Sequence, residues 1–97
     1  MVRKRLPKGW TEGSVEELLG LTPEESAIVE MRVRLAERVR ERRRAKRMTQ
    51  RELAERIGST QPRVAKLEQA GASIEMLMRA LLALGVGRQE IARLLAA

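Results

Sequence analysis

The sequence predicts an all-α fold, and three observations support this prediction. The chain of 97 residues has no Phe or Tyr and only one Trp, so its core must come from aliphatic side chains. Apolar residues recur at helical spacing between recognisable capping and helix-breaking residues. No run alternates apolar and polar residues in the manner of a half-buried strand. A chain of this length forms one small domain with room for an additional arm.

The N-terminal segment is expected to be a basic arm followed by a short helix. Residues 1–8 contain four Lys or Arg residues together with a proline. The stretch from Ser14 to Glu17 has the form of a capping box, which would begin a helix of one or two turns that ends at Gly20. We therefore assign residues 1–21 to the basic arm and this short helix.

A second, longer helix is predicted to open the main domain, residues 22–97. Thr22 is a suitable N-cap, and Pro23 suits the first helical position, where no intrahelical hydrogen bond is lost. The helix should continue to about Arg47, and its basic end complements the negative pole of the helix dipole. The stripe expected to be buried consists of Ile28, Met31 or Val33, Leu35 and Val39.

Two short helices separated by a glycine follow the long helix. The first is expected over about 49–56, and Gly58 permits the sharp turn after it. Thr60 is the N-cap of the second, over about 61–69. Together they predict a helix-turn-helix motif at 49–69. The apolar set that joins the two helices is Leu53, Ala54, Ile57, Val64 and Leu67.

Two further helices are predicted at the C-terminal end. Ser73 opens the first of them, and Gly85 follows it. Its apolar face contains Ile74, Leu77, Met78, Leu81 and Leu82. The apolar residues of the last helix are Ile91, Leu94 and Leu95. We expect this last face to form a symmetric dimer interface. The alternatives are that the face closes the core of the monomer, or that the N-terminal helix supplies the dimer contact.

The composition disfavours catalysis. The chain has no Cys, His, Asp or Tyr, so it lacks thiol nucleophiles, zinc clusters and a histidine general base, and we expect neither an enzyme nor a bound cofactor or metal. No apolar run approaches the length of a membrane span, and no signal-peptide core follows the basic start. We therefore expect a cytoplasmic protein.

The charge of the chain is positive and unevenly placed. The net charge is +7, and residues 32–47 carry nine basic residues against two glutamates. Residues 11–30 instead carry six glutamates and no Lys or Arg. A basic block directly before a helix-turn-helix pattern is typical of a nucleic-acid binder. A membrane-surface peptide would explain the charge but not the capped helices, and RNA binding is disfavoured by the lack of stacking aromatics.

The motif resembles the Cro/C1-type helix-turn-helix of the phage-repressor family, also called the XRE family. The matching residues are Thr49, Gln50, Glu52, Leu53, Ala54, Ile57, Gly58, Thr60, Gln61, Val64, Leu67 and Glu68. The resemblance implies a lambda-repressor-like domain of five helices, here with an N-terminal helical extension. It also implies a transcriptional regulator, most simply a repressor, that binds double-stranded DNA as a homodimer.

The resemblance assigns roles to several side chains. Gln50 would contact a phosphate, and Gln61 would read adenine in the major groove through its amide. The rest of the helix departs from the common family pattern, because Pro62 stands where a polar residue often reads a base. By their own chemistry, Pro62 could contact a thymine methyl group, and Arg63 and Lys66 could donate to guanine or to phosphate. The candidate DNA-contacting residues are therefore Arg42, Gln50, Arg51, Thr60, Gln61, Pro62, Arg63 and Lys66.

Two further positions carry expectations from the resemblance. Arg43 and Glu68 match a pair that forms a partly buried salt bridge between the first helix and the recognition helix. Arg47 occupies the position at which the family often ends that helix with glycine, so the sequence does not determine the last residue of the helix.

The layout of residues 12–40 ahead of the motif is similar to that of antitoxins of the HigA kind. Those proteins add an N-terminal helical extension to a Cro/C1-type domain, bind a ribonuclease toxin and regulate their own operon. This resemblance implies a toxin protein as a possible partner. The alternative is that the extension only completes the core.

Overall fold

The computed structural model describes residues 19–97, and every regular element in that range is a helix. The five helices are α2 (Pro23–Ala45), α3 (Gln50–Ile57), α4 (Gln61–Glu68), α5 (Ile74–Ala83) and α6 (Arg88–Ala96). The expected all-α architecture with a helix-turn-helix is therefore confirmed. The basic arm and most of the short helix expected near Ser14 lie outside the described residues.

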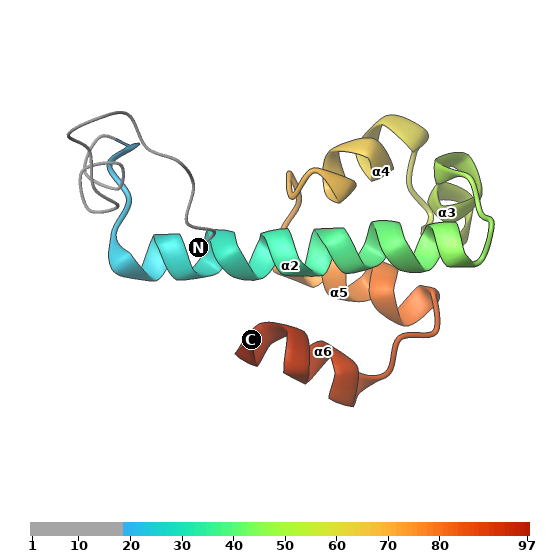
Figure 1. The fold of residues 1–97 in the computed structure, drawn as a ribbon. Helices are drawn as coiled ribbons and strands as arrows, with labels where there is room; N and C mark the ends of the chain where they lie inside the picture. The colour runs from blue at the N-terminus through green and yellow to red at the C-terminus, as the bar shows by residue number, and fades with distance from the viewer. Residues whose placement is uncertain (1–18) are drawn as a thin grey trace, which may run out of the picture. The chain divides into compact units, whose positions relative to one another are not determined.

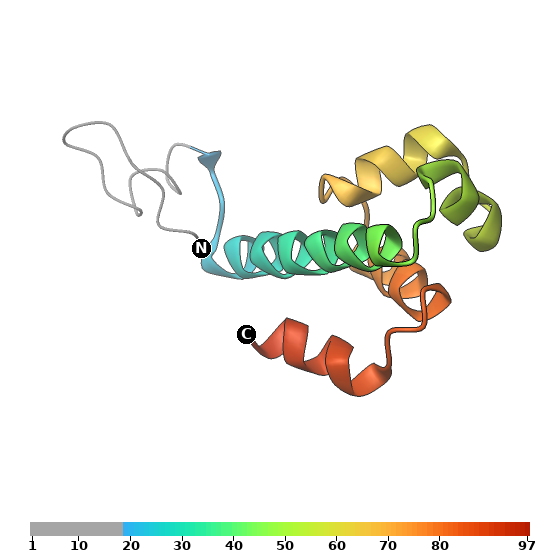
Figure 2. The ribbon, with the colours of Figure 1, turned by 45° about the vertical axis from the view of Figure 1, so that its right-hand side comes forward.

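Contacts divide the chain into two compact units, Met1–Glu30 and Met31–Ala97, and the second unit contains the helix-turn-helix. Within it, α4 and α6 lie on opposite sides of the C-terminal half of α2, and α3 lies near the end of α2 (Figures 1 and 2). No helix among residues 19–97 is long and apolar enough to cross a membrane.

The core of the second unit is aliphatic, as expected. It combines one line of α2 with the inner faces of the other helices, and every helix contributes at least one fully or nearly fully buried residue. Burial of these side chains is the main contribution to the stability of the fold. The buried hydrophobic residues are Leu35, Ala36, Val39, Leu53, Ala54, Val64, Leu67, Leu77, Ala80, Leu81, Leu84, Val86 and Ile91.

The start of α2 follows its capping signals, but its expected buried stripe is only half correct. Thr22 and Glu25 form a reciprocal capping box, with N–H to oxygen distances of 2.8 and 3.1 Å. Ile28 and Val33, expected inside, are 40% and 38% exposed. With 23 residues α2 is about 34 Å long, whereas the helices of 8–10 residues that follow it span about 12–15 Å. The shorter helices therefore cannot cover the whole of α2, and its line of buried residues begins only at Leu35.

The ends of four helices share one hydrogen-bond pattern, the Schellman motif, in which a residue with positive φ closes the helix. Gly58 and Gly85 take this position after α3 and α5, with φ of 67° and 85°. Arg47 and Ala70 take it after α2 and α4, with φ of 56° and 64°. A side chain in this conformation costs about 1–2 kcal/mol, so these two ends carry local strain.

The end of α4 differs from the prediction in its details. Gly71 was expected to end the helix, but the residue with positive φ is Ala70. Gly71 is needed for a different reason: a Cβ there would lie 3.0 Å from the carbonyl oxygen of Lys66. The glycine therefore permits a close approach of two backbone segments, while the residue before it makes the turn.

The apolar face of α6, predicted to form a dimer interface, packs at least in part on the core of its own chain. Ile91 is 6% exposed, and Leu94 and Leu95 are partly buried against the same core. The face therefore contributes to closing the monomer's core, and a dimer contact through its exposed part stays a prediction. The physical reason is that α5 and the turn after it leave an apolar surface that a short amphipathic helix covers.

Three arginines of α2 hold the C-terminal part of the chain, and we call them the arginine ladder: Arg34, Arg38 and Arg42. They lie four residues apart and therefore on one line of the helix. Arg34 Nε donates to the carbonyl oxygen of Leu94, and Arg42 Nε to that of Leu84, each over 3.1 Å. Arg38 Nε lies 2.5 Å from Glu90 Oε2.

Candidate nucleic-acid interface

The two helices of the motif begin with well-formed caps. Thr49 and Glu52 form a capping box at the start of α3, with distances of 2.8 and 3.0 Å. The Thr60 hydroxyl accepts the N–H of Arg63 at the start of α4 over 3.4 Å. These caps fix the first turn of each helix. As a result, Gln50 and Gln61 both occupy the first helical position of their helices.

The two glutamines contact each other directly. Nε2 of Gln61 donates to Oε1 of Gln50 over 2.7 Å. Nε2 of Gln50 in turn donates to Oε1 of Glu68 over 3.1 Å. The starts of both motif helices are thereby joined to the end of α4.

Arg43 completes this network from α2. Its Nε and Nη2 donate to the two carboxylate oxygens of Glu68 over 2.5 and 3.0 Å, a bidentate arrangement. Its Nη1 donates to the carbonyl oxygen of Met48 over 2.8 Å. Arg43 and Glu68 thus form the salt bridge that the sequence predicted. The pair is more buried than expected, since the residues are only 9% and 5% exposed.

The network fixes which way each amide faces. An ionised carboxylate only accepts hydrogen bonds, so Gln50 must turn its amino group toward Glu68. The carbonyl oxygen of Gln50 is then left to accept from Gln61. Gln61 in consequence keeps its own carbonyl oxygen and one N–H free, and its side chain is exposed. One donor and one acceptor of this exposed amide therefore remain available.

The other candidates on the motif differ in how available they are. Arg51, Pro62, Arg63 and Lys66 are exposed. The hydroxyl of Thr60 already serves as the helix cap. The exposed candidates belong to α3 and α4, the two helices that begin with the glutamines.

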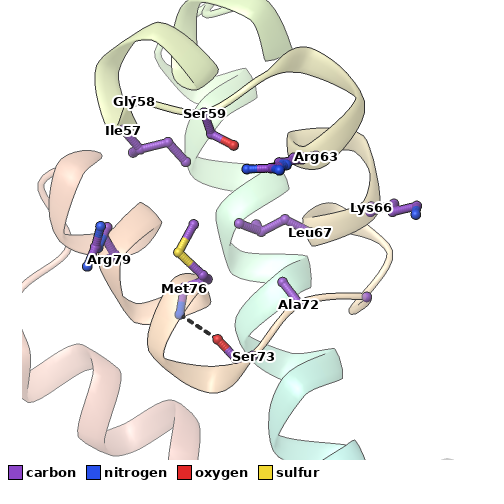
Figure 3. Close-up of a pocket in the computed structure, with 11 residues that line it drawn as sticks. Ile57, Gly58, Ser59, Arg63, Lys66, Leu67, Ala72, Ser73, Met76 and Arg79 are labelled. Carbon is purple, nitrogen blue, oxygen red and sulfur yellow. Dashed lines mark hydrogen bonds between the residues drawn. The ribbon is translucent and has the colours of Figure 1, made fainter.

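A groove of about 440 Å³ runs beside α4 (Figure 3). Ile57, Leu67 and Met76 give it an apolar lining. In Figure 3, Arg63 extends from α4 toward the groove and Arg79 lies across it on α5, while Lys66 points away from it. The two cationic groups make this side of α4 basic as well.

The interpretation of the basic block at 32–47 needs correction. The arginine ladder and Arg43 use their guanidinium groups for contacts within the fold. Arg42, predicted to contact DNA, is directed at the end of α5 and is not brought together with the glutamines. Arg44, Lys46 and Arg47 are exposed instead, at the end of α2 just before the first motif helix.

Sequence reasoning counted these three residues only as part of the basic block. The exposure of Arg44 alone could have been anticipated, because it directly follows Arg43, which the resemblance placed inside the fold, and successive helical positions turn by about 100°. Lys46 and Arg47 are three and four residues after Arg43, a spacing that places helical residues on the same face, so their exposure could not be predicted in this way.

The fold and this site define a helix-turn-helix protein, a class whose second motif helix enters the DNA major groove. Comparison with protein families agrees: a family model described as a helix-turn-helix domain matches residues 18–91. The chain therefore belongs to that family of helix-turn-helix domains. Comparison with curated proteins and with solved structures gives no match.

Proposed function

We propose that the protein is a sequence-specific transcriptional regulator, most simply a repressor, that places α4 in the major groove of double-stranded DNA. The observation that carries the proposal is the hydrogen-bonded pair of glutamines at the starts of the two motif helices. Helix starts present free backbone N–H groups, which favour phosphate, and an amide there can hold phosphate or read a base.

Gln61 is the proposed base-reading residue. Adenine presents an acceptor, N7, beside a donor, the N6 amino group, in the major groove. The free N–H and carbonyl oxygen of Gln61 are the complement of this pattern. Because the contact with Gln50 holds the amide in one orientation, the acceptor and the donor cannot exchange places without breaking that hydrogen bond. The site therefore favours adenine over bases with the reverse pattern.

Neighbouring side chains supply the remaining contacts. Arg63 and Lys66 are long donors on α4, and Pro62 is an exposed apolar group that fits a thymine methyl. Arg44 and Arg47, exposed just before α3 in the chain, contact the phosphate backbone in this proposal, whereas Lys46 is directed, like Arg42, at Gly85 after α5. Phosphate contacts give affinity and register, and base contacts give specificity.

A homodimer is part of the proposal, because one recognition helix contacts only a few base pairs. Two copies related by a two-fold axis would bind two half-sites about one DNA turn apart, roughly 34–36 Å. The expected binding site is therefore palindromic.

The test is selection of bound sites from random DNA, followed by binding measurements with variants. Gln61→Ala should weaken binding to the selected site by about 1–3 kcal/mol and relax the preference at one base pair per half-site. Gln50→Ala should relax the same base pair, because it releases the Gln61 amide. Gln89→Ala, an exposed glutamine of α6, is the matched control and should change nothing.

The pattern of loss decides the outcome. Equal weakening by Gln61→Ala on every DNA sequence would leave this residue only a backbone role. No enrichment of any site in the selection would refute the function itself.

A second candidate function is that of an antitoxin, and one observation favours it. The first part of α2 carries exposed apolar side chains, Ile28, Val29 and Val33, at 38–40% exposure. A helix surface of this kind suits a protein partner. Coexpression with the protein encoded beside it tests this: a stable complex that weakens with Val29→Lys supports the antitoxin, and independent migration of the two proteins refutes it.

A further inference from the structure

A line of apolar side chains runs along the outer face of α5. Ile74, Met78 and Leu82 lie four residues apart, which places them on one side of the helix. They line an open groove of about 530 Å³ together with Glu75 and Arg79, and all five residues come from α5. Leu82 is 52% exposed. We call these three residues the α5 stripe.

The α5 stripe lies at the edge of the face of α5 that closes the core: Ile74 and Met78 are partly buried against the core, and Leu82 lies outside it. Leu77, Ala80 and Leu81 fill the core and are fully buried. Leu82 was expected to share their face, but it lies outside. An isolated exposed leucine is ordinary on a protein surface. Here Leu82 stands in line with the partly exposed Ile74 and Met78, and the three together line an open apolar groove, which indicates a contact surface.

Two copies of α5 related by a two-fold axis would place opposite charges beside each other along the α5 stripe. Glu75 and Arg79 lie on one flank of the stripe, 3.8 Å apart, with side chains 83% and 59% exposed. In an antiparallel pair of α5 helices, a two-fold axis near Met78 places Ile74 opposite Leu82 of the other copy. Glu75 and Arg79 are centred on Leu77, which is one residue, or a rise of about 1.5 Å along the helix, from the axis at Met78. The same axis therefore brings Glu75 near Arg79 of the second copy, twice.

We propose that the α5 stripe is the surface through which two copies of this chain associate, with α5 antiparallel to α5. This rests on the homodimer of the proposed function and assigns its interface to α5, in place of the α6 face. A helix of ten residues buries less than a standard interface of about 1,600 Å². The association is therefore weak in free protein and strengthened when two half-sites on one DNA hold both copies.

The test uses charge reversal and mixing of variants. Glu75→Arg alone and Arg79→Glu alone each turn both cross-dimer pairs repulsive. Each variant should weaken self-association roughly 5- to 30-fold in sedimentation equilibrium. A mixture of the two variants restores opposite charges at both pairs, so it should form a heterodimer with the affinity of the wild type. The same measurement on DNA with two half-sites should show cooperative binding lost in each variant and regained in the mixture.

Matched controls separate this effect from a general change in charge. Glu37→Arg and Arg88→Glu make the same charge changes at exposed positions outside α5, and should leave self-association unaltered. Circular dichroism checks that all variants remain helical.

The outcomes distinguish the interface from the function. Single variants that associate as the wild type does, or a mixture that fails to recover, would overturn the α5 interface. A wild-type protein that stays monomeric at about 1 mM and binds palindromic DNA singly would overturn it as well. Loss of all DNA binding by the wild type would refute the proposed function alone, because sedimentation of free protein still measures the interface.

Discussion

Two ion pairs leave α2 toward opposite sides of the domain, and they have the same length. Arg43 reaches Glu68 on α4, and Arg38 reaches Glu90 on α6, each with Nε 2.5 Å from Oε2. Their surroundings differ: the side chains are 11% and 3% exposed in the first pair, and 27% and 32% exposed in the second. Glu68 also accepts from Gln50, whereas water reaches the second pair. How much an ion pair contributes to the free energy of unfolding depends on its burial and on its other hydrogen-bond partners. The distance between the two charged groups does not by itself reveal this contribution.

The largest expected effect comes from breaking the buried pair. Glu68→Ala leaves the Arg43 guanidinium inside the fold without its counter-charge and frees Gln50. We expect a loss of about 3–5 kcal/mol in the free energy of unfolding, measured by urea denaturation. A loss below about 1 kcal/mol would mean that the buried pair behaves like a surface pair.

Removing both charges of the buried pair should cost less than removing one. Arg43→Met combined with Glu68→Met leaves no unpaired charge, and the lost hydrogen bonds to Met48 and Gln50 cost on the order of 1–2 kcal/mol together. DNA binding should suffer more than stability, because Gln61 loses its fixed orientation. Site preference and denaturation are measured on the same variant. A double variant less stable than Glu68→Ala would contradict this explanation.

A substitution in the turn beside the buried pair should stabilise the fold. Arg47 holds a positive φ so that Met48 can accept from Arg43. Arg47→Gly should raise the free energy of unfolding by about 1 kcal/mol, because glycine adopts this conformation without strain. Thermal unfolding measures the gain, and Arg44→Gly, within the helix, is a control that should destabilise by a similar amount. A loss of stability in Arg47→Gly would show that the arginine side chain stabilises the turn.

The smallest expected effect belongs to the exposed pair and depends on pH. The hydrogen bond from Arg38, with the nearby charges of Arg38, Arg93 and Arg42, lowers the pKa of the Glu90 carboxyl. A lowered pKa in the folded state means that the pair stabilises the fold above the ordinary glutamate pKa of about 4.3. This contribution is lost as the pH falls through the lowered value.

The measurement is thermal unfolding of the wild type and Glu90→Gln from neutral pH to about pH 3. The stability difference between them should be present at neutral pH and disappear in acid. A difference that is constant over this range would contradict the pH dependence.

Local signals in the sequence predicted most of the helix starts, because a cap depends on residues a few positions apart. Thr49, Thr60 and Ser73 cap helices at the expected places. Gly58 has the positive φ that its turn needs. The positive φ of Ala70 was not predictable, because the path of the chain imposes it on a residue with no preference for it.

Properties that depend on distant partners were harder to predict. The number of basic residues in 32–47 does not tell which of them point inward, so the arginine ladder was interpreted as DNA-binding charge. An apolar face such as that of Ile91 does not tell whether its own core or a second copy covers it. The network of Gln50, Gln61, Glu68 and Arg43 was predicted only as separate roles. The four side chains form one hydrogen-bonded network only because α2, α3 and α4 meet, and the spacing of residues in the sequence does not predict that meeting.

The way α6 is held has a consequence for how the protein opens. This helix buries only Ile91 fully, starts at Gly87 without a side-chain cap, and is tied to α2 by Arg34 and Arg38. Segments with few buried apolar contacts open at lower free energy than the rest of a domain. The amide hydrogens of α6 should therefore exchange with solvent well before those of α5. Since the motif helices have contacts of their own with α2, the domain can lose and regain its last helix while the DNA-facing part stays folded.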